Sequence, residues 1–304
     1  MAGKNIKNTS GQKKAKSTWL FKLVFVLGFI ILVYPQISDI YYRVESAEEI
    51  SAFEREKETL SAEEKDRRLA LAHAFNDALV NRIEADPYIR GQHEAGRAEY
   101  ARMLELHEQI GHIQIPSINV NLPIRTGTSE EILQIGAGHL EGTSLPVGGP
   151  STHTVVTAHS GLPTAKLFTD LRKVKTGERF YLHTLGGTLV YKVDQIKKVE
   201  PSQFEDLLVV PEADYATLLT CTPIMVNSHR LLVRGYRVPY DPAIDDPLIR
   251  QDGMTWVYQV GVVAAALFCL LMLALIIHYK KKASALAAEM GAIEGGVTGD
   301  KDEE

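Results

Sequence analysis

The sequence predicts a mainly β fold: a β-barrel or sandwich with short helices, preceded by a helical region and flanked by two transmembrane helices. Between residues 111 and 240, short segments rich in Val, Ile, Thr, Leu and Tyr are separated by Gly, Pro, Asn and Ser, which is typical of many short strands. Apolar residues at helical spacing mark residues 46–84 instead. A long apolar run near each end of the chain predicts the two membrane spans.

Composition restricts the class of protein. The chain has 304 residues, a net charge of −5, 45% hydrophobic residues and 23% charged residues, which is an ordinary globular mixture. No part of it is a strongly basic domain, so we expect no nucleic-acid partner. The two cysteines, Cys221 and Cys269, lack the spacing of a metal site. Because Cys269 lies inside an apolar run, we expect no disulfide between them.

The first apolar run, from Trp19 to Tyr34, predicts a membrane anchor over residues 18–35. The run is short for a span, and Lys22 near its start can extend its charged end to the interface. A cleaved signal peptide is the alternative interpretation. The sequence PQISDIYY that follows contains no small-x-small cleavage site, so we expect an uncleaved anchor.

The second apolar run, from Trp256 to Tyr279, has no charged residue and is long enough to cross a bilayer with some tilt. Lysines precede the first run and follow the second: Lys4, Lys7, Lys13, Lys14 and Lys16, then Lys280, Lys281 and Lys282. The positive-inside rule therefore predicts that both termini are cytoplasmic and that residues 36–254 lie outside the cell membrane.

Two capping-box patterns predict two successive helices within residues 46–84. Ser46 is followed three residues later by Glu49, and Ser61 is followed by Glu64. An apolar stripe at helical spacing, which we expect to pack against the following domain, consists of Leu69, Ala72, Phe75 and Leu79.

The sequence Asp86-Pro87-Tyr88 interrupts this helical region. Because the residue before a proline is disfavoured in a helix, we expect the helix to end near Ala85. A second helical stretch is expected over about residues 94–110. The interruption is then a stiff loop between two helices.

Seven segments predict the strands of the β domain: HIQIP, INVNLPI, HTVVTAH, RFYLHT, GTLVYKVDQI, YATLLTC and RLLVRGYRV. The stretch TAKLFTDL, residues 164–171, predicts one or two helical turns. Residues 241–254 are rich in Asp and Pro and are interpreted as a linker to the second span.

Cys221 is the candidate nucleophile. It ends the run TLLTC and is followed by Thr222-Pro223, and a strand that stops at a proline is expected to expose its last residue at the barrel rim. The alternative is an inert core cysteine, because free cysteines are among the most buried residues. A single free cysteine is unusual in an extracellular domain, which raises the question of whether its thiol is reactive.

A cysteine nucleophile needs a base and a group that stabilises the developing oxyanion. His159 lies at the end of the strand HTVVTAH, directly before a loop, whereas the rival histidines are His153, His183 and His229. Arg230 opens the strand RLLVRGYRV, and its rivals Arg234 and Arg237 lie deeper in that strand. A structural or solvated role stays open for each of these residues.

These segments resemble the sortases. TLLTC, followed nine residues after the cysteine by Arg230, resembles the TLxTC…R signature, and TAHSGLPTAKLF resembles the histidine region of that family. Further features resemble class C, the pilin-polymerising sortases: GHLEGTSLPVGG at 138–149, NSHRLLVRG at 227–235, the DPY segment and the C-terminal span. The resemblance implies a sortase-type β-barrel and covers about residues 70–240 and the two-anchor arrangement.

The resemblance also implies the roles of the site residues. Cys221 is the nucleophile, His159 the acid/base, and Arg230 the group that binds the oxyanion or positions the substrate. Asp86, Pro87 and Tyr88 correspond to a lid, in which the aspartate faces the arginine and the aromatic ring faces the cysteine. The family commonly has Tyr-Gly after CTP, but this chain has Ile224-Met225, which puts its preferred sorting motif in doubt.

The implied function is cleavage of an LPxTG-like sorting signal between Thr and Gly, followed by transfer of the acyl group to a lysine of another pilin subunit. No metal or organic cofactor is implied. One alternative is a housekeeping sortase that attaches surface proteins to peptidoglycan. The other is a membrane-anchored surface protein without catalysis, itself a sortase substrate, but DPLIRQDGMTW before the second span contains no LPxTG-like motif.

The predicted organisation is a cytoplasmic tail, a transmembrane anchor, an extracellular helical region with the lid at 86–88, a catalytic β-barrel, a linker, a transmembrane helix and a second cytoplasmic tail. These occupy residues 1–17, 18–35, 36–110, 111–240, 241–254, 255–279 and 280–304.

Overall fold

The computed structural model describes residues 10–79, 103–106, 108–250 and 255–297. The chain divides into two compact units, Met1–Asp252 and Gly253–Glu304. The helices are α1 (Ser10–Thr59), α2 (Ala62–Ala78), α3 (Glu130–Ile135), α4 (Pro242–Ile249) and, in the second unit, α5 (Thr255–Val297). The strands are β1 (Gln109–Ile115), β2 (Val120–Thr126), β3 (Ala137–His139), β4 (Thr152–Thr157), β5 (Arg179–Thr184), β6 (Gly187–Val199), β7 (Asp214–Thr222) and β8 (His229–Val238).

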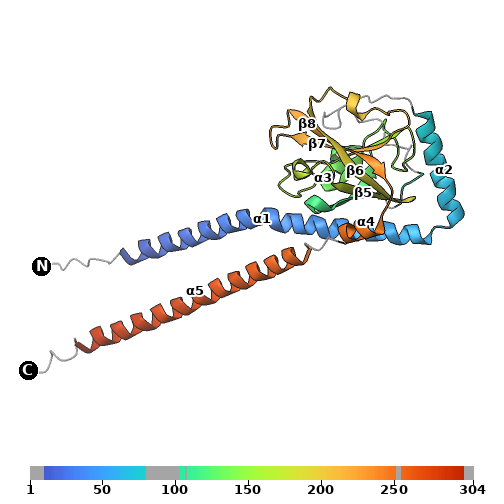
Figure 1. The fold of residues 1–304 in the computed structure, drawn as a ribbon. Helices are drawn as coiled ribbons and strands as arrows, with labels where there is room; N and C mark the ends of the chain where they lie inside the picture. Colours follow the sequence, from blue (N-terminus) through green and yellow to red (C-terminus); the bar gives the residue numbers. More distant parts are fainter. Residues whose placement is uncertain (1–9, 80–102, 107, 251–254, 298–304) are drawn as a thin grey trace, which may run out of the picture. The chain divides into compact units, whose positions relative to one another are not determined.

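The strands form a closed barrel in the order β1-β2-β3-β4-β7-β8-β6-β5. Strands β5 to β8 are labelled in Figure 1. Two of the neighbouring pairs, β2–β3 and β4–β7, are parallel, and the others are antiparallel. Each of the seven predicted segments supplies a strand, which confirms the mainly β barrel. The sequence prediction missed β3, because a strand of three residues, Ala-Gly-His, gives no run of β-favouring residues.

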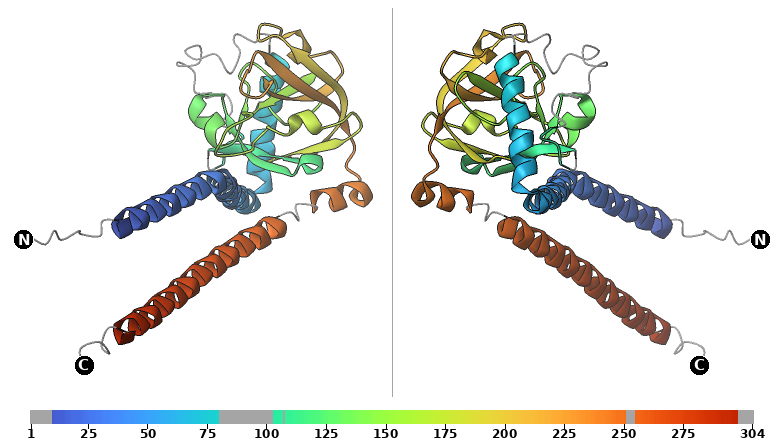
Figure 2. Two further views of the ribbon diagram at one scale, coloured as in Figure 1. Left: turned by 90° about the vertical axis from the view of Figure 1, so that its left-hand side faces the viewer. Right: turned by 90° about the vertical axis from the view of Figure 1, so that its right-hand side faces the viewer.

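The barrel core includes residues of the preceding helices. Phe53 of α1 and Ala72 of α2 are completely buried and belong to the same apolar cluster as the interior strand residues. The C-terminal part of α1 and one face of α2 therefore pack on the barrel, and both helices lie beside it in the turned views (Figure 2). The predicted packing of the helical region on the β domain is correct.

Only one of the two predicted capping boxes starts a helix. Helix α1 continues through Ser46, which is buried against the barrel, so the predicted start there is wrong. The local pattern was overridden because residues before Ser46 also contact the barrel: Arg43 donates from Nη1 to the carbonyl of Asn119 at 3.2 Å.

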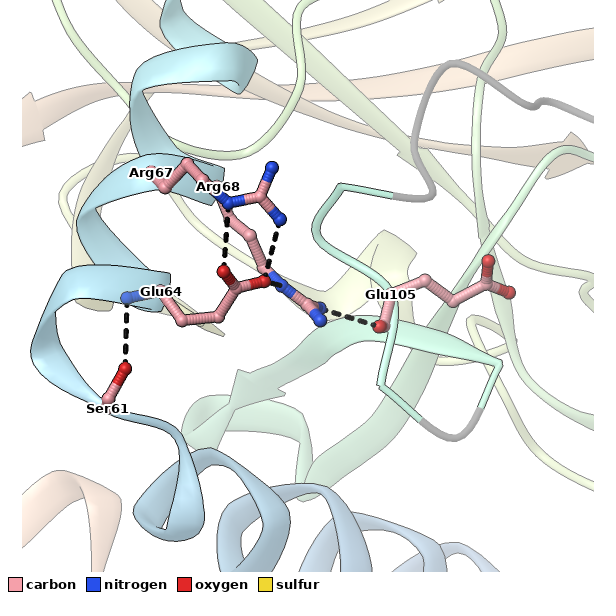
Figure 3. Close-up of polar contacts among 5 residues, drawn as sticks. All are labelled: Ser61, Glu64, Arg67, Arg68 and Glu105. Carbon is pink, nitrogen blue, oxygen red and sulfur yellow. Dashed lines mark hydrogen bonds and ion pairs between the residues drawn. The ribbon is translucent and has the colours of Figure 1, made fainter.

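Ser61 does cap α2, since its Oγ accepts from the N–H of Glu64 at 3.2 Å (Figure 3). The Glu64 carboxylate accepts from Arg67 and Arg68 rather than returning to the cap. These two guanidinium groups lower the pKa of Glu64 to about 2. Arg68 also donates to the backbone carbonyl of Glu105 at 3.4 Å, so it joins α2 to the segment just before β1.

Three further predictions of local structure differ from the fold. Helix α2 ends at Ala78, earlier than the expected end near Ala85. In the predicted helical stretch 94–110, residues 94–102 and 107 lie outside the described residues, and Gln109 begins β1 after Glu108, whose φ of 62° no helix adopts. The stretch 164–171 forms turns, and the 3-10 helix η3 (Leu171–Lys173) starts only at its end.

Residues 242–249 form helix α4, where a linker was predicted. Asp241 caps the helix by accepting from the N–H of Ala243 at 3.0 Å, and a proline occupies the first helical position, which is a favoured start. The Asp245 carboxylate is fully buried and accepts from Arg179 at 2.7 Å and from the Tyr181 hydroxyl at 2.8 Å. Contacts with β5 therefore stabilise a segment whose composition suggested a linker.

The two predicted membrane spans fall within α1 and α5. Over the described ranges, no helix combines the length and the apolar character needed to cross a bilayer. Both spans therefore stay predictions.

Two buried histidines are stacked between neighbouring strands. His112 of β1 and His183 of β5 are register partners, with ring centroids 4.3 Å apart and ring planes 13° apart. Burial lowers the pKa of His183 to about 4 and lowers the pKa of His112 well below its usual value, and the charge of Lys57 acts in the same direction. Glu54 lies 3.8 Å from Nδ1 of His112, yet the pKa of His112 stays lowered because burial dominates.

This pair predicts that stability falls on acidification. An unfolded histidine titrates near pH 6.5, and folded His183 titrates near pH 4. The stabilisation is therefore fully present above pH 6.5 and is lost as the pH falls toward 4. One such group corresponds to about 3 kcal/mol. Melting curves of the full chain between pH 7.5 and 4.5 should show this loss.

The matched control is the exposed His73 of α2. His183→Gln should flatten the dependence of melting temperature on pH, whereas His73→Gln should leave it unchanged. A pH dependence in His183→Gln identical to that of the unsubstituted chain would contradict the assignment.

Candidate active site

Three neighbouring segments bring His159, Cys221 and Arg230 to one level of the barrel. Strand β7 pairs with β8 so that Cys221 lies opposite Arg230. Strand β4 pairs in parallel with β7, with Thr157 beside Leu219, so continuing that register by two residues places His159 beside Cys221. Residues opposite each other on adjacent strands have Cβ atoms about 4.5–5.5 Å apart.

Side-chain alternation puts all three on the outer face of the barrel. Val156 and Ala158 of the β4 segment and Leu218 of β7 belong to the interior cluster. Successive residues of a strand point to opposite faces, so His159 and Cys221 point outward. Arg230 shares their face because it is the register partner of Cys221.

A second apolar cluster occupies this outer face next to the three residues. Its members are Leu140, Val155, Leu207, Leu219 and Leu232. Val199 and Phe204 are partly buried against it, and Val199 is also the register partner of Arg230 on β6. The polar residues therefore lie at the edge of an apolar surface built by β4, β7 and β8 and by the segment between β6 and β7.

Cys221 is buried, with 5% of its surface exposed. The prediction that it would be exposed as the last residue of its strand is wrong, because β7 continues to Thr222, whose partner on β8 is His229. Cys221 and Cys269 are both free thiols.

His159 is largely buried, and this burial lowers the pKa of its imidazole. The Glu130 carboxylate, 3.4 Å from Nε2, acts in the opposite direction but does not overcome it. Sequence reasoning missed Glu130, which lies in the first turn of α3, a helix too short to give an apolar period. The signal that could have located it is Ser129 followed by two glutamates, a typical helix start.

The loop after His159 is fixed at several points. The Ser160 hydroxyl donates to the carbonyl of Cys221 at 2.7 Å, and the N–H of Phe168 donates to the carbonyl of His159 at 3.0 Å. Gly161 has a φ of +77°, and a Cβ there would lie 2.6 Å from Cγ2 of Ile224, so only glycine fits. The histidine segment is thus attached to the backbone of Cys221 and lies against Ile224.

Arg230 is buried, and backbone carbonyls hold its guanidinium. Nη1 donates to Asn227 O at 3.0 Å and to His229 O at 3.2 Å. Asn227 has a φ of 56°, a left-handed conformation that asparagine tolerates well. The turn between β7 and β8 therefore orients the cation beside Cys221.

The rival histidines have structural surroundings. His153 is buried, donates from Nδ1 to Leu208 O at 2.9 Å, and has Nε2 2.7 Å from Thr217 Oγ1. Burial lowers its pKa to about 4. His183 belongs to the stacked pair on β5, and Nδ1 of His229 lies 2.8 Å from the hydroxyl of Ser228.

The rival arginines contact other groups as well. Arg234 forms a two-point ion pair with Asp194, at 3.2 and 2.7 Å. Arg237 lies with its guanidinium carbon 5.7 Å from the centre of the Tyr191 ring. Among the predicted candidates, the register thus brings together only His159, Cys221 and Arg230.

Asp86, Pro87 and Tyr88, the predicted lid, lie outside the described residues. Ile224 contacts the histidine loop at Gly161, whereas Met225 is 83% exposed. In the part of the chain that the structure covers, no group of three or more His, Cys, Asp or Glu side chains is arranged to hold a metal ion.

The barrel residues match a known family. The model of the sortase domain matches residues 113–238. The crystal structure of sortase C-1 from Streptococcus pneumoniae is 59% identical and has a TM-score of 0.62; the match covers 64% of this chain and 100% of that one. The pilus-related sortase C of Group B Streptococcus is also 59% identical, with a TM-score of 0.61 and coverage of 63% and 98%.

A curated relative is more distant. Sortase A of Bacillus anthracis is 29% identical over 134 residues, which are 43% of this chain and 61% of that protein. The matches confirm the predicted barrel and the predicted resemblance. Because a solved sortase C is 59% identical and is covered over its whole length, the chain belongs to the sortase family and, within it, to class C.

Proposed function

We propose that this chain is a membrane-anchored cysteine transpeptidase that assembles pili. It cleaves an LPxTG-like sorting signal between Thr and Gly and transfers the acyl group to a lysine of another pilin subunit. The observation that carries the proposal is the alignment of His159, Cys221 and Arg230 across three adjacent segments, on one outer face of a sortase barrel.

Cys221 is the nucleophile of the proposed reaction. His159, whose lowered pKa leaves it neutral at pH 7, accepts the thiol proton as the sulfur attacks the threonine carbonyl. The tetrahedral intermediate then collapses to a thioester, and His159 returns the proton to the departing glycine amine. A lysine amine of the next pilin attacks the thioester and loses a proton to His159 as the isopeptide bond forms. The leaving sulfur of Cys221 takes this proton from His159, which restores the thiol and the neutral imidazole.

Arg230 stabilises the negative charge that develops on the carbonyl oxygen. A guanidinium held by two carbonyls is oriented before substrate arrives, so little reorganisation is needed. Charge-assisted hydrogen bonds of this kind are about twice as strong as neutral ones. The neighbouring apolar cluster lowers the local polarity and strengthens the same attraction.

Pilin is favoured over peptidoglycan as the acceptor. The solved relative named as pilus-related is 59% identical to this chain, whereas the curated sortase A is 29% identical. The alternative of a housekeeping sortase predicts a cell-wall amine as the second nucleophile, and mass spectrometry of the product linkage distinguishes the two.

The membrane arrangement is part of the proposal. Residues 18–35 and 255–279 cross the cell membrane, both termini are cytoplasmic, and residues 36–254 are extracellular. The support is the apolar sequence of both runs and the lysines beside them. Such anchoring raises the effective concentration of membrane-held pilin substrates near the site.

The catalytic roles predict a graded series of variants. Cys221→Ala should abolish pilin polymerisation, because it removes the covalent intermediate. Arg230→Ala should lower kcat by roughly 10²–10³-fold, and Arg230→Lys should recover little because an ammonium lacks the planar fork. His159→Ala should also cost orders of magnitude, measured as polymer formation on denaturing gels.

His153→Ala is the control for His159→Ala, since His153 lies on the same strand segment but makes structural hydrogen bonds. Its effect should appear in melting temperature rather than in the rate per folded molecule. Undiminished polymers from Cys221→Ala would refute the catalytic assignment.

The lid remains a prediction from the resemblance. An exposed carboxylate–guanidinium pair contributes only about 0–1 kcal/mol, so such a lid opens easily. In a Cys269→Ser background, where Cys221 is the single thiol, replacing Asp86 and Tyr88 with alanine should speed alkylation of Cys221 with little change in melting temperature. Equal alkylation rates would show that these residues do not guard the thiol.

Cysteine labelling of intact cells tests the membrane arrangement. In a Cys221→Ala, Cys269→Ser background, the exposed Ser202 and Ser284 offer one reporter position on each predicted side. Ser202→Cys should react with a membrane-impermeant maleimide in intact cells, and Ser284→Cys only after permeabilisation. Labelling of both without permeabilisation would contradict the proposed topology.

A further inference from the structure

A buried carboxylate connects helix α1 to the loop that follows His159. Asp39 lies on α1 and is only 7% exposed. Its Oδ1 accepts from the backbone N–H of Lys166 at 3.0 Å, a contact between residues 127 positions apart. Its Oδ2 accepts from Nε of Arg43 at 3.0 Å. Leaving a buried carboxylate without hydrogen-bond donors costs free energy. The hydrogen bonds of Asp39 to Lys166 and Arg43 are therefore expected to persist.

Arg43 extends this connection to the barrel. Nη1 of Arg43 donates to the carbonyl of Asn119 at 3.2 Å, in the turn between β1 and β2. Asp39 is therefore oriented by an arginine that is itself attached to the barrel. The carboxylate acts as a fixed acceptor for the Lys166 amide and not as a freely rotating side chain.

Lys166 lies two residues before the amide that contacts the candidate acid/base. The N–H of Phe168 donates to the carbonyl of His159 at 3.0 Å, and the Phe168 side chain is completely buried in the core. Between the two amides, Leu167 has a φ of 38°, which is uncommon for a residue with a side chain. Such a conformation persists only where its surroundings hold it, and Asp39 fixes one side of it.

The space beside Asp39 indicates that this residue contributes little to the packing of the core. A small cavity of about 30 Å³, enough for a water molecule, is lined by Asp39, Tyr42, Arg43, Asn119, Lys166 and neighbouring residues. Because this space adjoins the contact, the Lys166 amide can be hydrated if the carboxylate is removed. Loss of Asp39 then releases the loop while removing little apolar contact from the core.

We propose that Asp39 is a positioning residue for the active site. By holding the Lys166 amide, it fixes the backbone from Lys166 to Phe168 and through it the position of His159. Helix α1 thus participates in setting the geometry of the acid/base. The inference rests on the proposed function of His159 and adds to it a residue that lies outside the reacting groups.

A second contact between α1 and the barrel supplies a matched control. Glu49, ten residues further along the same helix, accepts from Nη2 of Arg125 on β2 at 2.7 Å through both carboxylate oxygens. This pair attaches α1 to the barrel without contacting the loop after His159. Replacing Glu49 weakens the docking of the helix, whereas replacing Asp39 also releases the loop.

The test compares steady-state kinetics of full-length variants on a quenched fluorescent peptide that contains an LPxTG sequence. Asp39→Ala should lower kcat about tenfold to a hundredfold with KM within a factor of two, because small misplacements of catalytic groups have effects of that order. Asp39→Asn should restore part of kcat, because its amide oxygen can still accept from Lys166 while its NH2 group cannot accept from Arg43. Glu49→Ala should leave kcat per folded molecule unchanged.

Asp39→Glu is an independent variant in case Asp39→Ala does not fold. It keeps the charge but moves the acceptor by one methylene group, so an intermediate kcat is expected. An unchanged kcat in Asp39→Glu, or equal losses in Asp39→Ala and Glu49→Ala, would overturn the positioning role. Full activity of Asp39→Ala beside an inactive Cys221→Ala refutes this inference alone, whereas an active Cys221→Ala refutes the proposed function itself.

Discussion

The parallel pairing of β4 with β7 is the interaction on which the site depends. Its register, Thr157 beside Leu219, sets which residue after β4 lies next to Cys221. A slip of one residue would turn the outward face inward and place Ala158 where His159 now lies. Two hydrogen bonds beyond the strand secure this register: the Thr220 hydroxyl donates to Ala158 O at 2.7 Å, and the Ser160 hydroxyl donates to Cys221 O at 2.7 Å.

Burial of this outer face determines the charge states and the hydrogen bonding of the three residues. Cys221 and Arg230 are both buried although they point away from the barrel interior, because the outer apolar cluster and the segment between β6 and β7 lie beside them. A buried guanidinium is tolerated when its donors have partners, and the carbonyls of Asn227 and His229 supply two of these. The same desolvation favours the uncharged form of His159.

Sequence patterns were sufficient for the barrel, and the resemblance to the sortases selected the three residues that the register brings together. Runs of β-favouring residues separated by turn residues located seven of the eight strands, and β3 was missed because it has only three residues. The continuation of α1 through Ser46 and the helix at Pro242–Ile249 were missed for another reason. Both are stabilised by distant parts of the barrel: α1 by Asn119 in the turn between β1 and β2, and α4 by Arg179 and Tyr181 of β5. Such contacts leave no local signal.

The features of the site that the sequence prediction missed also depend on contacts between distant segments. The exposure of Cys221 was predicted from the proline that follows Thr222, but burial depends on what covers the face, which a strand pattern does not encode. Glu130 and Asp39 come from segments separated in sequence from the cysteine by about ninety and one hundred and eighty positions. Only the folded chain brings them near the loop of His159.

The place of β8 in the barrel has a consequence for biosynthesis. This last strand lies between β6 and β7, so the barrel cannot close until the ribosome has delivered the residues up to Val238. Phe53 and Ala72, made much earlier, belong to a core that is sealed only then. Arg230 arrives with the closing strand. A nascent chain that ends before β8 therefore contains Cys221 without Arg230 beside it.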